Sequence, residues 1–279
     1  MNLLNYFAYS KINLGLQVLN RRNDGYHNIN TVFYLINLYD ELEFSISDKI
    51  EIVTEPALDI PIESNLIYKA GKLFLNRNNI EGGFRVVVKK KIPIGGGLGG
   101  GSSDAATTVT ALNRMYNTGL SISNMLDIVG EIGSDCPFFL SGYRHSTGQG
   151  RGEILNSFNS SLICKIAVVN PGINVSTAQA YKLLGRSGEK CAEKNFADII
   201  KGGSNNPKYF RDKITNDFED VIFALHPEIA QIKSTLYKLG ADFALMSGSG
   251  STVFGLFTGE LTIDKLQSAF PDYFCHISE

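Results

Sequence analysis

Apolar and polar residues alternate strictly near the start of the chain. Between residues 11 and 18 every second side chain is apolar, and Lys11, Asn13 and Gln17 stand among the residues between them. A period of two is typical of a strand that is buried on one face. The same patterning predicts strands over residues 31–38, 41–46 and 84–91, and Asn23-Asp24-Gly25 predicts a turn.

Apolar residues at helical spacing predict three helices in the first half of the chain. The first is capped by Ser64 and ends at Asn78-Asn79, and the second follows a glycine run with Ser102 or Ser103 as its cap. The third covers residues 123–132 and leads into a loop, Gly-Ser-Asp-Cys-Pro, that contains Asp135.

Strand and helix patterns also alternate in the second half. We expect strands over 163–169, 242–246, 252–257 and 273–277, a short helical stretch ending at Tyr181, helices over 218–225, 227–240 and 263–270, and a polar loop-rich region over 185–206. This order suits a split βαβ sandwich. The fold class is therefore α+β, with an N-terminal domain over residues 1–158 and a C-terminal domain over 159–279.

Composition narrows the class of protein. The 279 residues are 43% hydrophobic and 19% charged, which excludes a disordered or collagen-like chain. With 26 basic and 28 acidic residues, no nucleic-acid or membrane-surface partner is expected, and no apolar run approaches the roughly 20 residues of a membrane helix. The four cysteines form no CxxC pair, so we expect a cytoplasmic protein. No exposed apolar stripe stands out, and we expect a monomer or weak homodimer.

The strongest signal is the run from Gly95 to Ser103, in which six of the first seven residues are glycine. Glycines let backbone N–H groups approach an anion, and a helix that begins directly afterwards adds unpaired N–H groups and the positive end of its dipole. The run therefore predicts a phosphate cradle, where Ser102 or Ser103 could help to hold Mg²⁺. A flexible linker is the alternative, and a strand and a helix on either side argue against it.

Two known glycine motifs fit this run poorly. The dinucleotide fingerprint matches Gly95, Gly97 and Gly100, but it requires an acidic residue about 20 positions on, where Met115 to Gly119 forms a turn. The P-loop requires a Gly-Lys-Ser/Thr sequence after the glycines, and none follows.

Asp135 and Lys11 are the candidate acid and cation. Phosphoryl transfer to an alcohol needs a group that positions the hydroxyl and accepts its proton, and positive charge near the moving phosphoryl group. A carboxylate and an ammonium supply both if they meet, but the spacing does not show that they do. The alternatives are that Asp135 caps a helix and that Lys11 faces solvent.

Two further turns carry weaker signals. Tyr26 and His27 follow the tight turn at Gly25, so they could stack on a planar ring and bond its edge, although a strand-start tyrosine is the commoner explanation. The four histidines show no metal-ligand spacing. The Gly-Ser loop over 246–252 is either a plain hairpin or a second source of backbone donors for phosphate.

Eight segments in order resemble the GHMP kinase superfamily, which includes galacto-, homoserine, mevalonate and phosphomevalonate kinases. They are SKINLGLQV, RRNDGYHNINTVF, SNLIYKA, IPIGGGLGGGSSDAA, IGSDCPFFLSG, NPGINVSTAQAY, NDFED and LMSGSGSTVF. The glycine run marks the superfamily, and the DGYH turn narrows the resemblance to members with a cytidyl substrate. Ser10 and Ser134 depart from the usual alanines without removing a functional group.

The resemblance implies an N-terminal domain of ribosomal-protein-S5 type, a C-terminal ferredoxin-like domain, and ATP-dependent phosphorylation of a hydroxyl in isoprenoid precursor biosynthesis, with Mg²⁺. Asp135 would be the catalytic base or would orient the hydroxyl, with Lys11 beside it. The residues it implies for ATP are Asn65, Pro93, Ile94, Gly95, Gly96, Gly97, Leu98, Gly99, Gly100, Gly101, Ser102 and Ser103. No protein ligand of the metal is implied, apart from Ser103 as a candidate.

For the substrate, the resemblance implies that Tyr26 and Tyr181 sandwich the cytosine and that His27 bonds its edge. Asn13 would contact the sugar-alcohol part, and Gly248, Ser249 and Gly250 would line the phosphate side. Three alternatives stay open: a GHMP kinase for another alcohol such as homoserine or mevalonate, a nicotinamide-dependent dehydrogenase, and a nucleotide-binding module without catalysis.

Overall fold

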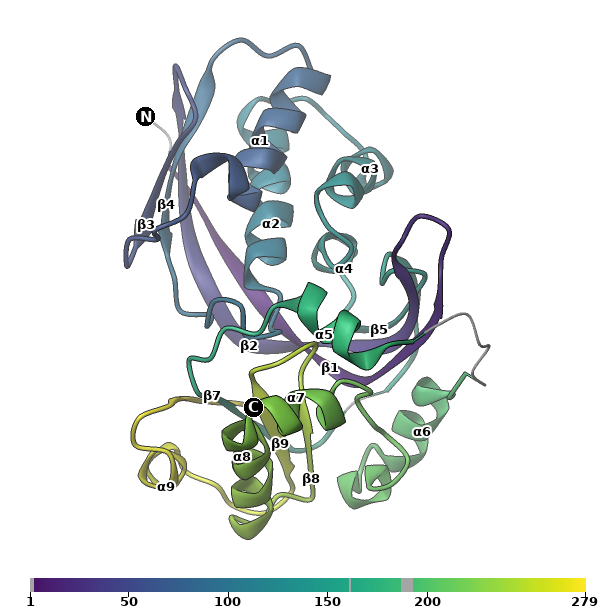
Figure 1. Cartoon of the computed structure of the whole chain (residues 1–279). Helices are drawn as coiled ribbons and strands as arrows, with labels where there is room; N and C mark the ends of the chain where they lie inside the picture. The colour runs from purple at the N-terminus through teal and green to yellow at the C-terminus, as the bar shows by residue number, and fades with distance from the viewer. Residues whose placement is uncertain (1–2, 161, 187–192) are drawn as a thin grey trace. The chain divides into compact units, whose positions relative to one another are not determined.

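The chain forms two compact units in the computed structural model, which describes residues 3–160, 162–186 and 193–279 (Figure 1). Unit 1 contains residues 1–10, 38–92 and 99–143, and unit 2 contains residues 11–37, 93–98 and 144–279. Each unit is built from three separate segments of the chain. The predicted domains, 1–158 and 159–279, are each one continuous segment of the chain, and this division remains a prediction.

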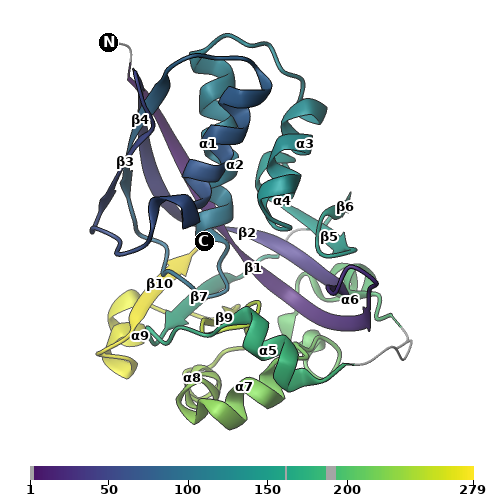
Figure 2. The same cartoon turned by 45° about the horizontal axis from the view of Figure 1, so that its top comes forward.

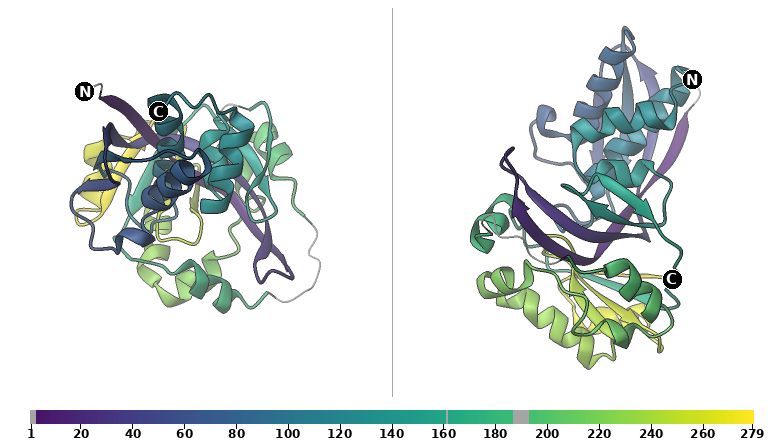
Figure 3. Two further views of the ribbon diagram at one scale, coloured as in Figure 1. Left: turned by 90° about the horizontal axis from the view of Figure 1, so that it is seen from above. Right: turned by 90° about the vertical axis from the view of Figure 1, so that its right-hand side faces the viewer.

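Two long strands, β1 (Leu4–Arg21) and β2 (His27–Ser47), contribute residues to both units. They pair with each other, and Figure 3 shows them as neighbouring purple strands. The sequence predicts two strands over 31–38 and 41–46, but β2 runs without interruption. Residues 11–18 are buried on both faces of β1, not on one face as the alternation suggests.

Unit 1 places four helices beside its part of the six-stranded sheet. Strand β4 (Gly83–Lys89) pairs antiparallel with β2 and parallel with β3 (Glu51–Glu55), which the sequence analysis missed. The helices are α1 (Leu66–Arg77), α2 (Gly100–Met115), α3 (Ile122–Ile132) and α4 (Cys136–Leu140), and a 3₁₀ turn, η1 (Ile62–Ser64), precedes α1. Figures 1 and 2 show α1 and α2 side by side.

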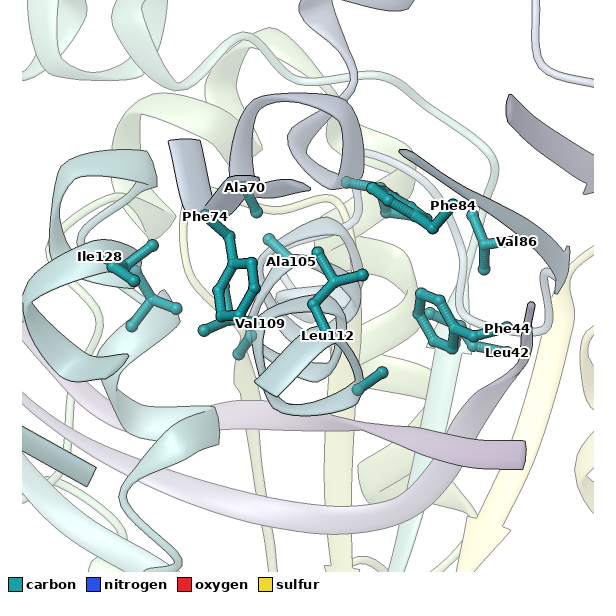
Figure 4. Packing of buried hydrophobic residues seen from close by; sticks show 14 of the residues in the cluster. Leu42, Phe44, Ala70, Phe74, Phe84, Val86, Ala105, Val109, Leu112 and Ile128 are labelled. Carbon is teal, nitrogen blue, oxygen red and sulfur yellow. The ribbon is translucent and has the colours of Figure 1, made fainter. Parts of the chain in front are cut away.

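The core of unit 1 lies between these helices and the sheet (Figure 4). Phe74 on α1 and Val109 on α2 belong to this core together with Phe44 on β2 and Phe84 on β4, and all four side chains have no exposed surface. Apolar residues three and four positions apart on α1 and α2 bring one face of each helix into this core. Burying them removes apolar surface from water, which is the main force that holds the unit together.

The helix caps differ from the prediction. Asn65, not Ser64, caps α1: its side-chain oxygen accepts a hydrogen bond from the Ile67 amide at 2.9 Å. Gly99, in the left-handed conformation, precedes α2, so Ser102 and Ser103 lie within the helix instead of capping it. The predicted end at Asn78-Asn79 is confirmed, because Asn78 is the C-cap of α1.

Unit 2 contains a four-stranded antiparallel sheet in the order β10-β7-β9-β8. Its strands are β7 (Lys165–Asn170), β8 (Phe243–Met246), β9 (Val253–Phe257) and β10 (Phe274–Ser278). Numbered along the chain, this order is 4-1-3-2, as expected for the predicted split βαβ arrangement. Figure 1 shows α8 (Pro227–Lys238) beside β8 and β9.

The other helices of unit 2 are α5 (Thr177–Leu184), α6 (Phe196–Gly203), η2 (Pro207–Phe210), α7 (Glu219–Leu225) and α9 (Ile263–Ala269). Tyr181 lies inside α5, not at its end. Helix α6 falls in the region predicted as loop, of which residues 187–192 lie outside the described residues. Two short strands of the larger sheet, β5 (His145–Gln149) and β6 (Ile154–Ser157), were also missed.

The described part of the chain contains no helix that is both long enough and apolar enough to span a bilayer. Cys136, Cys164 and Cys275 are free thiols, and Cys191 lies outside the described residues.

We predict that Gly71→Ala destabilises the protein. Alanine normally favours a helix over glycine by about 1 kcal/mol. At Gly71 in α1, however, a Cβ atom would lie 2.3 Å from Cε1 of the fully buried Phe84, so the substitution overpacks the core and should cost about 1–3 kcal/mol. Urea denaturation of the variant measures the change in the free energy of unfolding.

Gly130→Ala is the matched control. Gly130 lies within α3, and no other atom lies within 4 Å of a Cβ added there, so this variant should be as stable as the parent or more stable by up to about 1 kcal/mol. Equal effects of the two substitutions would contradict the packing argument.

Candidate functional site

The first part of the glycine loop, Pro93–Leu98, is held in unit 2 by its carbonyl oxygens. The Gly97 carbonyl accepts hydrogen bonds from Lys11 Nζ and Ser247 Oγ, both at 3.0 Å. The Gly96 carbonyl accepts one from the Thr252 amide at 3.2 Å, and the Leu98 carbonyl accepts one from the Lys11 amide at 3.0 Å. Within the described residues, the N–H groups of Gly95–Leu98 donate no hydrogen bond to the protein, so they are available to an anion.

Close packing explains why these positions are glycine. A Cβ atom on Gly97 would lie 2.1 Å from the Ser247 carbonyl oxygen, and one on Gly96 would lie 2.5 Å from Nδ2 of Asn170. Gly97 also has a φ of +78°, where an L side chain is strained. The backbone can therefore take this path only without side chains.

The second part of the loop opens α2 in unit 1. Gly99 precedes the helix, and Gly101 is exposed. The first amides of an α-helix have no acceptor within the helix and lie at the positive end of its dipole, so Gly100, Gly101 and Ser102 offer N–H groups to a phosphate. Ser102 is half-buried, whereas Ser103 is only 2% exposed.

Lys11 is buried, so the alternative of a solvent-facing strand lysine is wrong. Its ammonium donates to Asn13 Oδ1 at 2.6 Å as well as to the Gly97 carbonyl, and it lies 5.5 Å from the centre of the Phe33 ring. Asn13 is fixed in turn by Thr31 Oγ1, 2.9 Å from its Nδ2, and by Ser247 Oγ, 3.1 Å from its backbone nitrogen. Lys11 and Asn13 thus form one rigid group with the loop.

Asp135 occupies the N-cap position of α4 in unit 1, but its side chain makes no capping hydrogen bond. Asp135 therefore stands at the cap position, as the alternative expects, but its carboxylate does not cap the helix. The carboxylate is partly buried and follows Gly133 and Ser134. The next residue, Cys136, is fully buried; this burial raises the pKa of its thiol to about 12, and the charge of Asp135 contributes in the same direction.

The Gly-Ser loop between β8 and β9 is held by an asparagine that the sequence analysis did not select. Asn216 Nδ2 donates to the carbonyl oxygens of Met246 at 2.7 Å and Gly248 at 2.8 Å. Ser249 Oγ lies 2.9 Å from Thr177 Oγ1 on α5. Asn216 lies in the NDFED segment and is 4% exposed; its burial is visible only in the structure, so the sequence offered no local signal for this role.

The residues predicted for the cytosine are arranged in two pairs. The His27 ring stacks on the Tyr181 ring, with 5.0 Å between centroids and 13° between planes, and His27 Nε2 lies 3.1 Å from the Arg186 carbonyl oxygen. Tyr26 is 57% exposed, and the guanidinium of Arg151 lies 5.2 Å from its ring centre. His27 and Tyr181 are thus in contact, while Tyr26 presents its ring to Arg151, a residue that the sequence analysis did not select.

The remaining predicted residues fall on both units. Asn65 belongs to unit 1, where its side chain caps α1, and Gly248 and Gly250 belong to unit 2, both with positive φ. Among the described residues there is no group of three His, Cys, Asp or Glu side chains that could hold a metal ion.

Two family models match the chain. The model described as "GHMP kinases N terminal domain" matches residues 65–143, and the model described as "GHMP kinases C terminal" matches residues 193–274. A solved homoserine kinase from Cytophaga hutchinsonii superposes with a TM-score of 0.73 at 18% identity, covering 100% of this chain and 95% of that one. At that identity the likeness concerns the fold alone.

Two other proteins are more similar in sequence. A relative from Thermodesulfovibrio yellowstonii, "4-diphosphocytidyl-2-C-methyl-D-erythritol kinase", is 40% identical over 274 residues, 97% of this chain and 95% of the relative. A crystal structure of "4-(cytidine 5'-diphospho)-2C-methyl-D-erythritol kinase" superposes with a TM-score of 0.80 at 31% identity, covering 99% of this chain and 98% of that one. The predicted α+β GHMP kinase fold is confirmed, and the chain belongs to the 4-diphosphocytidyl-2-C-methyl-D-erythritol kinase family of the GHMP kinases.

Proposed function

We propose that this chain transfers the γ-phosphoryl group of ATP to a hydroxyl of 4-diphosphocytidyl-2-C-methyl-D-erythritol, giving the 2-phosphate and ADP, in the non-mevalonate route to isoprenoid precursors. The observation that carries the proposal is the glycine loop: the carbonyl oxygens of Gly96–Leu98 are bonded to the protein, while the N–H groups of Gly95–Leu98 donate to no other described residue. The names of the relatives at 31–40% identity support the choice of substrate.

The loop acts as the phosphate site in this proposal. The amides of Gly95–Leu98 and the first amides of α2 bond the phosphate oxygens, since every one of these groups is a donor and most belong to glycine, which has no side chain. Asn65, at the N-terminus of α1, lies near the adenine. Gly248, Ser249 and Gly250 serve the phosphate side of the site.

Asp135 and Lys11 have separate roles in the transfer. Asp135 accepts the proton of the substrate hydroxyl or orients that hydroxyl, and the hydroxyl oxygen bonds to the γ-phosphorus as the bond to ADP breaks. Lys11 brings a fixed positive charge, and its burial strengthens that charge's effect on a developing alkoxide. Asn13 contacts the methylerythritol part.

The cytosine is recognised by Tyr26, His27 and Tyr181. A base that stacks between Tyr26 and Tyr181 takes the place that the His27 ring occupies on Tyr181, and His27 turns to bond the edge of the base. A homoserine or mevalonate kinase has no use for this aromatic group, so the cytidyl substrate is favoured over the other alcohols of the superfamily.

Mg²⁺ neutralises charge on the phosphates when it is bound. The hydroxyls of Ser102 and Ser103 are the candidates beside it, and the greater exposure of Ser102 favours that residue. We place the protein in the cytoplasm, as a monomer or weak homodimer, with no nucleic-acid or membrane partner.

A coupled assay of ADP release tests the proposal directly. We expect turnover with ATP and the cytidyl substrate, and none with homoserine or mevalonate at the same concentrations. Equal turnover with homoserine would overturn the choice of substrate, and nucleotide binding without any turnover would favour a non-catalytic module.

Asp135→Ala should lower kcat by roughly a hundredfold or more, because general base catalysis contributes at least that factor. ATP should still bind, since the glycine loop is unchanged, and a titration of ATP by calorimetry checks this. Asp127→Ala, which removes an exposed carboxylate from α3, is the control and should keep the parental kcat. Parental turnover in Asp135→Ala would remove this residue from the mechanism.

Tyr26→Ala should raise the KM for the cytidyl substrate about tenfold, because stacking of a base on an aromatic ring is worth about 1–3 kcal/mol. The KM for ATP should change less than twofold. Tyr209→Ala, which removes a similarly exposed tyrosine, should change neither value. Equal rises in both KM values for Tyr26→Ala would contradict the cytosine assignment.

A further inference from the structure

Three charged residues form a buried cluster in unit 1 that the proposed function does not use. The Lys90 ammonium donates to Asp40 Oδ2 at 2.5 Å and to Asp104 Oδ2 at 2.7 Å. The exposed fractions of the three side chains are 7% for Lys90, 0% for Asp40 and 5% for Asp104. The run of lysines at 89–91 suggests a solvated surface in the sequence, and the burial of its middle member is unexpected.

The cluster joins the two ends of the glycine loop. The chain leaves unit 1 after Ile92 and returns to it at Gly99. Before the loop, Asp40 Oδ1 accepts hydrogen bonds from the backbone amides of Lys91 at 2.5 Å and Ile92 at 2.9 Å. After the loop, Asp104 lies in the second turn of α2, the helix that the loop opens.

Both acids act on the cation between them. Burial by itself lowers the pKa of Lys90, but the charges of Asp104 and Asp40 outweigh it and raise the pKa above its ordinary value, so the ammonium stays charged. Asp104 Oδ1 has no hydrogen-bond partner among the described residues. A buried ion cluster of this kind seldom adds stability compared with apolar residues of the same size, so a role in fixing one geometry is the better explanation of its presence.

We propose that Asp40, Lys90 and Asp104 are positioning residues that hold the two ends of the glycine loop at a fixed separation, so that its amides are already arranged for the phosphates of ATP. This inference rests on the proposed use of the loop. A free run of glycines loses more backbone entropy on ordering than any other sequence, which would weaken the binding of ATP by the same free energy. If the two ends of the loop are already fixed in the free protein, the loop loses less backbone entropy when ATP binds.

The direction in which ATP affinity changes when an acid is removed distinguishes positioning of the loop from a simple effect of charge. Removing a negative charge near a phosphate site should, by charge alone, tighten the binding of a polyanion. If the cluster positions the loop, removing either acid should instead weaken the binding of ATP. Asp40→Asn keeps an oxygen for the Lys91 and Ile92 amides but offers the Lys90 ammonium an amide group in place of a charged partner, whereas Asp40→Ala removes all three bonds.

The experiment measures the Kd of ATP by calorimetry and the KM values of ATP and the cytidyl substrate for Asp40→Ala, Asp40→Asn and Asp104→Ala. We expect ATP to bind about tenfold more weakly to Asp40→Ala, the effect of losing charged hydrogen bonds, with partial recovery in Asp40→Asn. The KM of the cytidyl substrate should change less than twofold. Glu41→Gln removes the exposed partner of Lys91 on the same strand and is the control, with ATP binding unchanged.

Tighter or unchanged ATP binding in Asp104→Ala overturns the inference. An equal rise in the KM values of ATP and the cytidyl substrate also overturns it, because it would indicate that the whole structure has become less ordered. Asp104→Ala leaves Lys90 with one acid and decides the question if Asp40→Ala fails to fold. If the parent protein binds ATP but does not phosphorylate the cytidyl substrate, the proposed substrate is wrong while the ATP titrations still test the cluster.

Discussion

The Lys11 ammonium is buried, and two of its hydrogen bonds shape the candidate phosphate site. A buried charge without partners costs several kcal/mol, and the hydrogen bonds from Lys11 to Asn13 and to the Gly97 carbonyl offset part of that cost. Because the second of these acceptors belongs to the glycine loop, the lysine and the loop backbone are fixed together. The residue that we propose to act on the hydroxyl thus also supports the proposed phosphate cradle.

The proposed phosphate site consists of main-chain groups. The carbonyl oxygens of Gly96, Gly97 and Leu98 are turned toward the protein, which leaves the opposite edge of the backbone to offer N–H groups. In this proposal the backbone amides of the loop take the place of a lysine of the P-loop type. The lack of a Gly-Lys-Ser/Thr motif is therefore compatible with a phosphate site of a different construction.

The sequence predicted those features that depend on local pattern. The glycine loop, the strand and helix on either side of it and the order of the elements in the second half were correct, because period, caps and glycine content are local. Strand β2 was divided in two because Asp40 interrupts its apolar pattern. That aspartate is buried with the Lys90 ammonium and the amides of Lys91 and Ile92 as its partners. Asn216 was missed for a similar reason: its acceptors at Met246 and Gly248 are about 30 residues away, and no local pattern marks such a pair. The roles of Asp135, Tyr26 and the other site residues remain predictions.

The bond between the Asn13 amide and Ser247 Oγ joins residues 234 positions apart. A ribosome adds on the order of 5–20 residues per second, so the first strand must wait tens of seconds for this partner to be synthesised. During that interval Asn13 lacks its partner at Ser247, so its backbone amide stays hydrated. The nascent chain therefore carries its first strand without the final partners of that strand until most of the protein has been made.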